Sequence, residues 1–345
     1  MNLDELIQKA RVTQNFTDLR KYSVYGYGTN KQRRSVWRLL LNLPKSYNPT
    51  IIDTSITKEA VGKEVQVKAD VLRTFSSIPS PEFKDHKRNQ LYRVLLTVLE
   101  RNPQLSYTQG FHDIASVVLT FAREPLAVLI LEALSLGHLK PFLREDLSGL
   151  ASALNFVFPL LKLIDSELHD FIDSNDLDSS FATSYLLTFF THNALTLNDG
   201  LRYLDFFISS HPLMTVYSVV TLVFMKKSSL MIPEADPGTL MNGFHDLLVD
   251  TNVDEIIQKS VELFERYPPS FILKNDKSIR ISKNCTFLAP NVEFPYSFPD
   301  FPFVDRFPKD LYDKRLNEST SNNLIKGILS ALAIAAAIGM RIALM

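Results

Sequence analysis

Glycine is scarce in this sequence, with 11 residues among 345. Long stretches also repeat their apolar residues at the helical period, and together these features predict an almost all-helical protein. Residues 88–103 put Leu91, Val94, Leu95, Val98 and Leu99 on one face of a helix, which Pro103 should end near Arg101. Residues 212–224 are rich in β-branched side chains, but their length and setting favour a buried helix.

Cysteine is nearly absent, and charge of either sign is not in excess. The single Cys285 cannot form an internal disulfide, which indicates a reducing compartment. Net charge is −1 and no basic stripe is present, so nucleic acid is not an expected partner. The N-terminus lacks the apolar stretch of a secretory signal.

The common catalytic signatures are missing as well. The sequence contains no GxxxxGK[ST], GxGxxG, HExxH or GxSxG motif. His112 and Asp113 are adjacent, and adjacent residues do not share a helical face, so we expect no metal pair there. The chain is therefore expected to bind no metal, cofactor or nucleotide of its own.

The last apolar run of the chain carries no charge from Gly327 to Met340. Lys326 and Arg341 flank it with long stems that can snorkel, so residues 324–343 provide about 20 residues of hydrophobic length. A buried amphipathic helix is the alternative, but the run is apolar on all faces. We therefore predict a transmembrane tail anchor with the rest of the chain in the cytosol.

The same run spaces small residues four apart, at Gly327, Ala331, Ala335 and Gly339. Such a stripe can pair two helices in a membrane, which makes a homodimer possible, although any alanine-rich helix shows this spacing by chance. Before the run, residues 286–308 alternate Pro and Phe with acids, which excludes a helix. They are expected to form an extended linker, with docking of their phenylalanines on the helical body as the alternative.

Two polar residues are conspicuous. In residues 61–73, Val61, Val65 and Leu72 lie to one side of the expected helix, with Asp70 and Arg73 roughly opposite and able to pair. Taken alone, this is an ordinary surface ion pair. Gln109 in "YTQG" follows one apolar run and precedes another, and taken alone it is a polar residue at a helix start.

Together the two side chains suggest a specific chemistry. GTP hydrolysis needs an arginine to neutralise charge developing on the transferred phosphoryl group, and a glutamine to orient the attacking water. A protein with both residues and no nucleotide site is suited to supply them in trans to a GTPase.

Three motifs, in the same order, resemble those of the TBC-domain Rab GTPase-activating proteins. The family's RxxxW appears as "RRSVW" at Arg33 and Trp37, its IxxDxxR as "VKADVLR" at Asp70 and Arg73, and its YxQG as "YTQG". "SSFATSYLLTFFTH" is similar to a later family segment. Val67 departs from the first isoleucine, and Phe111 stands where many members have methionine. The resemblance covers roughly residues 26–270.

The resemblance implies an all-α, multi-helix fold and a dual-finger mechanism. Arg73 matches the arginine finger and Gln109 the glutamine finger, with Asp70, Tyr107 and Gly110 in support. Mg²⁺ and GTP would be bound by the partner, a Rab GTPase in its GTP form. Residues 1–25 would form an N-terminal extension, 26–270 the TBC domain, 271–323 the linker and 324–343 the anchor.

"GFHDI", "HPLM" and the terminal apolar run look most like one subgroup of that family. This subgroup is anchored in the endoplasmic reticulum and activates Rab-one GTPases in traffic to the Golgi. Two other functions remain open. A membrane-tethered scaffold would bind a Rab without catalysis, and a membrane-shaping protein would leave the three motifs unexplained.

Overall fold

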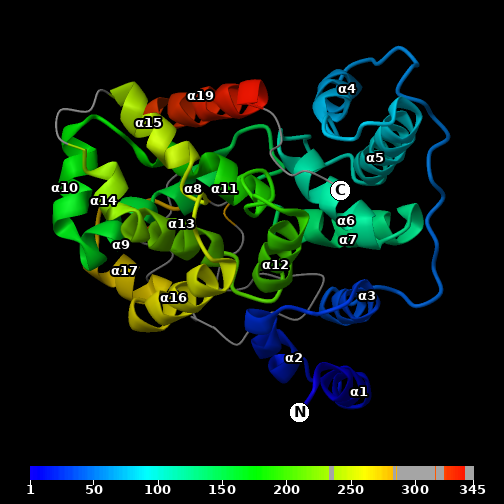
Figure 1. Ribbon diagram of the computed structural model, residues 1–345, viewed down its shortest axis with the longest axis horizontal. Helices are drawn as coiled ribbons and strands as arrows, with labels where there is room; N and C mark the ends of the chain where they lie inside the picture. The colour runs from blue at the N-terminus through cyan, green and yellow to red at the C-terminus, as the bar shows by residue number, and fades with distance from the viewer. Residues whose placement is uncertain (233–236, 283–284, 286–314, 316–321, 339–345) are drawn as a thin grey trace.

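The computed structural model describes residues 1–232, 237–282, 285, 315 and 322–338. These residues form helices joined by turns and contain no β-strand element, which confirms the all-helical prediction (Figure 1). The α-helices are α1 Leu3–Thr13, α2 Thr17–Lys21, α3 Asn30–Leu40, α4 Glu64–Arg73, α5 Pro81–Arg101, α6 Phe111–Phe121, α7 Glu124–Leu136, α8 Ser148–Leu154, α9 Val157–Ile164, α10 Ser166–Ser174, α11 Thr183–Thr188, α12 Leu197–Phe207, α13 Met214–Met225, α14 Lys227–Leu230, α15 Pro237–His245, α16 Val253–Arg266, α17 Pro269–Asn275 and α19 Asn322–Ile338. Two 3₁₀ helices, η1 Tyr22–Tyr25 and η2 Ser179–Ala182, complete the set.

The centre of the molecule is built around α13. All of its residues from Met214 to Val223 are buried, and it packs against α9, α11 and α16. Residues 214–225 therefore form a helix that is buried up to Val223, as predicted, in spite of their β-branching. A helix enclosed on all sides needs no polar face, and its tertiary contacts outweigh its modest intrinsic propensity.

α5 also follows the sequence closely. The Ser80 hydroxyl accepts a hydrogen bond from the backbone N–H of Phe83, Pro81 occupies the first turn, and the helix ends at Arg101. The predicted face is buried at Leu91, Val94, Leu95 and Val98, and partly buried at Leu99. This face joins α5 to α4, α6 and α7, and so fixes the positions of the two segments that carry Arg73 and Gln109.

α4 is oriented differently from the prediction. The helix begins only at Glu64, and Val61, Val65 and Leu72 are 75%, 55% and 46% exposed. Its buried side chains are Val67, Asp70 and Val71. The apolar count favoured the wrong face because the buried face includes a carboxylate, whose burial is offset by the ion pair and hydrogen bond described below.

The RxxxW residues form a buried polar hub between α3 and α12. Arg33 donates through Nε and Nη2 to the two carboxylate oxygens of Asp205, each at 2.9 Å, and Trp37 Nε1 donates to Asp205 Oδ1 at 2.9 Å. The backbone N–H of Tyr27 donates to the same carboxylate. Arg33 and Trp37 therefore hold the N-terminal helices on the core.

The predicted transmembrane helix is not found. Within the described residues, no helix combines the length and apolar character needed to cross a membrane. Residues 324–338 of the predicted span belong to α19, and residues 339–343 lie outside the described part of the chain, as does the predicted linker at 286–308. α19 instead packs on the helical body, which is the alternative of a buried amphipathic helix.

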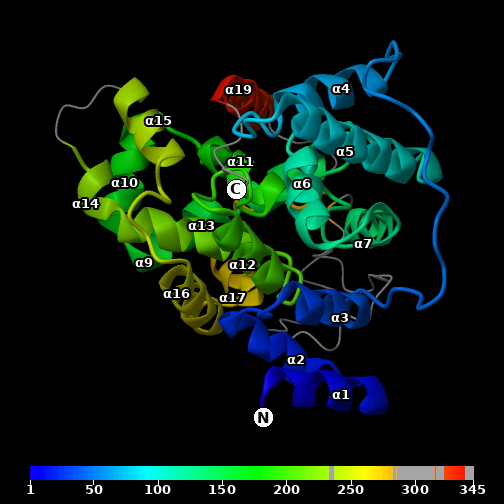
Figure 2. The ribbon, with the colours of Figure 1, turned by 45° about the vertical axis from the view of Figure 1, so that its right-hand side comes forward.

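α19 lies between α15 and α4 in both views, at the end of the molecule opposite α1 and α2 (Figures 1 and 2). It contacts η2, α11 and α8. Leu324 and Ile328 are buried in this contact, whereas Leu329 faces outward. Gly327 of the small-residue stripe lies against η2 of the same chain, so the structure gives no support to pairing of two copies through this residue.

Candidate functional site

Asp70 lies between the two predicted finger segments. Its Oδ1 is 2.6 Å from Arg73 Nη2, and its Oδ2 accepts a hydrogen bond of 2.6 Å from the Tyr107 hydroxyl. The Asp70 side chain is buried, and that of Arg73 is 28% exposed. One buried carboxylate thus fixes the arginine directly and fixes the chain two residues before Gln109. This pair is not the ordinary surface ion pair that sequence spacing alone suggests.

His112 extends this network to the backbone of Gly110. Its Nδ1 accepts a hydrogen bond from the backbone N–H of Gly110 at 3.3 Å and lies 3.2 Å from the Tyr107 hydroxyl. Burial lowers the pKa of His112, which keeps the imidazole neutral and its Nδ1 able to accept. Burial, with the Asp70 charge beside it, raises the pKa of Tyr107, which keeps the phenol a donor.

A second buried carboxylate lies deeper, at Asp113. Its Oδ2 accepts from His192 Nδ1 at 2.9 Å, and its Oδ1 lies 3.2 Å from His112 Nε2. Burial acts to raise the pKa of Asp113, but the nearby His112 and His192 outweigh it, so the net shift is downward. This carboxylate remains charged and ties the first turn of α6 to the segment after α11.

Gly110 begins α6 in a conformation that other residues rarely adopt, with φ at 101°. A Cβ atom at this position would also come within 2.8 Å of Thr188 Cγ2 on α11. Both constraints are internal to the chain, so glycine is required whether or not a partner approaches. The turn holds Gln109 directly before a helix whose remaining first-turn residues are buried.

The structure brings Arg73 and Gln109 to the same small hollow, although they lie 36 positions apart in the sequence. Gly110, His112 and Asp113 line it from α6, and Leu332 lines it from α19. The remaining lining residues come from α11 and the segment after it, namely Ser184, Leu187, Thr188 and His192. Sequence reasoning missed this last group and the role of His112, and the only signal was the family-like segment "SSFATSYLLTFFTH".

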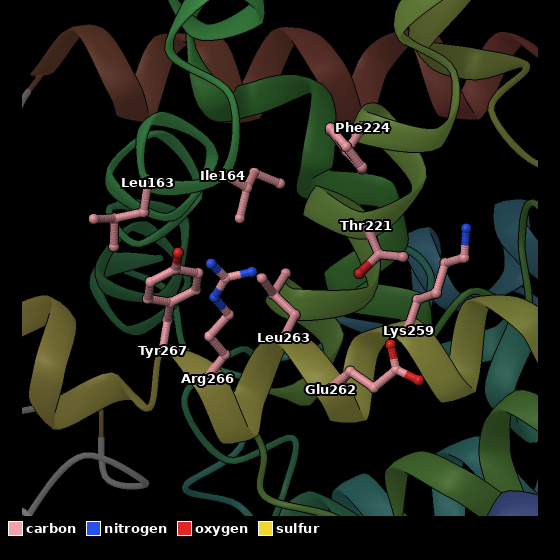
Figure 3. A pocket seen from close by; sticks show the side chains of 9 residues that line it. All are labelled: Leu163, Ile164, Thr221, Phe224, Lys259, Glu262, Leu263, Arg266 and Tyr267. Carbon is pink, nitrogen blue, oxygen red and sulfur yellow. The ribbon is translucent and has the colours of Figure 1, made fainter.

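A second hollow lies elsewhere in the described structure. It measures about 390 Å³ and lies between α9, α13 and α16, lined by Leu163, Phe224, Lys259 and Arg266 among others (Figure 3). None of the residues predicted to be functional lines it. In the described residues, no group of three or more His, Cys, Asp or Glu side chains is placed to hold a metal ion.

A comparison with known families identifies the domain. The Rab-GTPase-TBC domain family matches residues 30–232. The chain belongs to this family. The TBC domain so defined contains all the lining residues of the hollow except Leu332.

The curated relatives agree with this assignment. The chain is 28% identical to human TBC1 domain family member 20 over 321 residues, which is 90% of this chain and 79% of the human protein. It is 31% identical to the bovine protein of the same name, over 71% of this chain and 61% of that protein. It is also 28% identical to GTPase-activating protein gyp10 of Schizosaccharomyces pombe, over 71% of this chain and 66% of the yeast protein.

Two solved structures share the fold. The Ypt/Rab-GAP domain of Gyp1p superposes with a TM-score of 0.56 at 17% identity, covering 77% of this chain and 98% of that domain. The Chlamydomonas flagellar RabGAP TBC domain gives 0.54 at 17% identity, covering 74% of this chain and 88% of that one. At these identities the likeness establishes the TBC fold alone.

The Asp70 contacts lead to a prediction about positioning. Asp70→Asn keeps the side-chain shape but removes the charge that holds Arg73, so we expect the rate of stimulated GTP hydrolysis to fall about 10- to 100-fold. Binding to the GTP-loaded partner should change little, because Asp70 is buried. Single-turnover hydrolysis and equilibrium binding measure the two effects separately.

Asp85→Asn is the matched control. Asp85 forms the same kind of i,i+3 pair with Arg88, at 3.8 Å, but it is largely exposed and lies outside the hollow. Its replacement should leave the rate unchanged. Equal losses in the two variants, or a loss at Asp70 caused by weaker binding alone, would contradict a positioning role.

Proposed function

We propose that this protein accelerates GTP hydrolysis by a Rab GTPase of the Rab-one class, supplying Arg73 and Gln109 in trans. One observation carries the proposal: both side chains line one hollow, and both finger segments are fixed by the buried Asp70 carboxylate. Arg73 would neutralise charge on the transferred phosphoryl group, and Gln109 would orient the attacking water. GTP and Mg²⁺ would be bound by the GTPase.

The exposed apolar face of α4 fits a protein partner. Val61, Val65 and Leu72 lie on the same helix or directly before it, and Leu72 adjoins Arg73. A GTPase covering these side chains would remove apolar surface from water while it brings its nucleotide to the arginine. The sequence pattern predicted that these three side chains face the core. In the proposed complex they would instead form part of the docking surface.

Hydrolysis by a panel of GTP-loaded Rab GTPases tests the proposal. The full chain, in excess, is expected to stimulate single-turnover phosphate release from a Rab-one protein, whereas the Arg73→Ala variant is not. A non-catalytic scaffold is the second candidate, favoured only by the exposed face of α4. Tight binding to GTP-loaded Rab without faster phosphate release would establish the scaffold instead.

We further propose that the chain acts at the endoplasmic reticulum membrane, with its helical body in the cytosol. The support is the uncharged apolar run from Gly327 to Met340. Contact of this run with a membrane would hold the domain close to membrane-bound Rab. Flotation of the expressed full chain with microsomes tests this, and recovery in the soluble fraction would reject it.

A further inference from the structure

α19 covers Gln109, one of the two side chains that the proposed mechanism uses. Gln109 Nε2 donates a hydrogen bond of 2.7 Å to the backbone carbonyl of Leu332 in α19. The amide that would orient a water molecule is therefore already occupied by this chain's own helix. Leu332 itself lines the hollow that contains Arg73 and Gln109.

The space left between the fingers is too small for a substrate. With α19 in place the hollow measures about 10 Å³, which is no more than the smallest cavity that can hold a single water molecule. A phosphoryl group and its attacking water need more room and must reach both side chains at once. The docked helix and a productively bound nucleotide therefore exclude each other.

The contact under α19 is closely fitted. Leu324 and Ile328 are buried against the body, and Gly327 faces η2. A Cβ atom at Gly327 would come within 2.8 Å of Asp178 Oδ2 and 2.9 Å of Ser180 Oγ. A bulky side chain at this position would collide with both residues, whereas Ser330, three residues on, is exposed.

We infer that the surface formed by η2, α11 and Gln109 has two alternative occupants, α19 of the same chain and the GTP-bound Rab. α19 is thus an autoinhibitory segment, and it must leave before the fingers can act. This inference rests on the proposed function. The rate seen with a given Rab would then scale with the fraction of molecules in which α19 is undocked.

A lipid bilayer is the acceptor that suits the released helix. α19 carries one charged side chain, Lys326, near its start, and from Gly327 to its end at Ile338 it is uncharged. Undocking in water would expose Ile328 and Leu324, whereas insertion of the helix into a membrane buries them again. Membrane contact would therefore shift the population toward the active arrangement.

The test compares two leucine substitutions in the full chain. Gly327→Leu places a bulky side chain against Asp178 and Ser180 without weakening the helix, because leucine is a better helix former than glycine. Ser330→Leu puts the same residue on the exposed face of α19. At limiting concentrations of protein, we expect Gly327→Leu to stimulate Rab hydrolysis at least tenfold more than the unaltered chain, and Ser330→Leu to match the unaltered chain.

A reversible lock provides a second measurement. The Cβ position at Gly327 lies 3.0 Å from Ser180 Cβ, so a small shift brings the pair Gly327→Cys and Ser180→Cys to disulfide distance. Oxidation should crosslink α19 to η2 and suppress stimulation, and reduction should restore it. Gly327→Cys alone should not respond, since Cys285 is buried.

The outcomes separate the two proposals. If the unaltered chain stimulates as well as Gly327→Leu, and Arg73→Ala abolishes both, α19 does not inhibit but the proposed function stands. If neither protein stimulates any Rab in the panel, the proposed function fails and the inference falls with it. Phosphatidylcholine vesicles should raise the rate of the unaltered chain toward that of Gly327→Leu, and an unchanged rate would exclude the bilayer as the releasing partner.

Discussion

The Arg73→Ala variant is expected to stimulate Rab hydrolysis about 10³-fold less than the unaltered chain, a barrier increase of roughly 4 kcal/mol. The guanidinium is held by Asp70 at 2.6 Å yet remains 28% exposed, so it is both oriented and able to reach a partner. Arg73→Lys should not restore the rate, because a single ammonium cannot make the planar, two-pronged contact. Single-turnover phosphate release measures the effect.

A matched control for this variant lies on the same helix. Lys68→Ala also removes one positive charge from α4, but Lys68 does not line the hollow. It should lower the rate at least tenfold less than Arg73→Ala does. The arginine-finger assignment is wrong if Arg73→Ala keeps more than a tenth of the stimulated rate while its thermal midpoint is unchanged.

The second large effect is expected at Gln109. Most GTPases position the attacking water with their own glutamine, and losing it usually cripples hydrolysis. If this chain supplies Gln109 instead, it should still accelerate a Rab whose switch glutamine has been replaced by alanine or leucine. Gln109→Ala should in turn remove most of the stimulation of the unmodified Rab.

Gln109 also bonds α19, so the experiment needs a background in which that helix is undocked. A two-by-two cycle, with both glutamines varied in the Gly327→Leu chain, isolates the chemistry from the release of α19. Gln109→Ala should weaken binding to Rab·GDP with aluminium fluoride and leave binding to Rab·GTP nearly unchanged. Loss of stimulation on removing the Rab glutamine, with no loss in Gln109→Ala, would leave "YTQG" as a turn only.

The sequence predicted those parts of the structure that depend on local pattern. α5 and α13 follow from periodicity and length, since each buries apolar side chains where the pattern puts them. The Asp70–Arg73 pair follows from i,i+3 spacing. The family assignment followed from three short motifs taken in order, and the match of residues 30–232 confirms it.

The misjudged parts depend on contacts between distant segments. α4 turns Val65 and Leu72 outward because the face that it buries includes the Asp70 carboxylate, which is satisfied by Tyr107, a residue 37 positions away. No local count of apolar residues contains that contact. His192 contacts Asp113 across 79 positions, so its place beside Arg73 and Gln109 could not be predicted from local sequence either. The composition of α19 suits lipid and protein surfaces alike, so its packing on the body, with Gly327 fitted against η2, could not be read from the sequence.

The Asp205 hub has a consequence for how the chain is made. Arg33 is synthesised 172 residues before the carboxylate that neutralises it. At about 5–20 residues per second, ribosomal elongation separates the two by roughly 9 to 34 seconds. Throughout that interval the guanidinium, which ends almost fully enclosed, has Asn30 of α3 as a hydrogen-bond partner but lacks the Asp205 carboxylate, so α3 cannot reach its final packing until α12 has left the ribosome. α3 is thus translated well before α12, but its packing is completed only together with that helix.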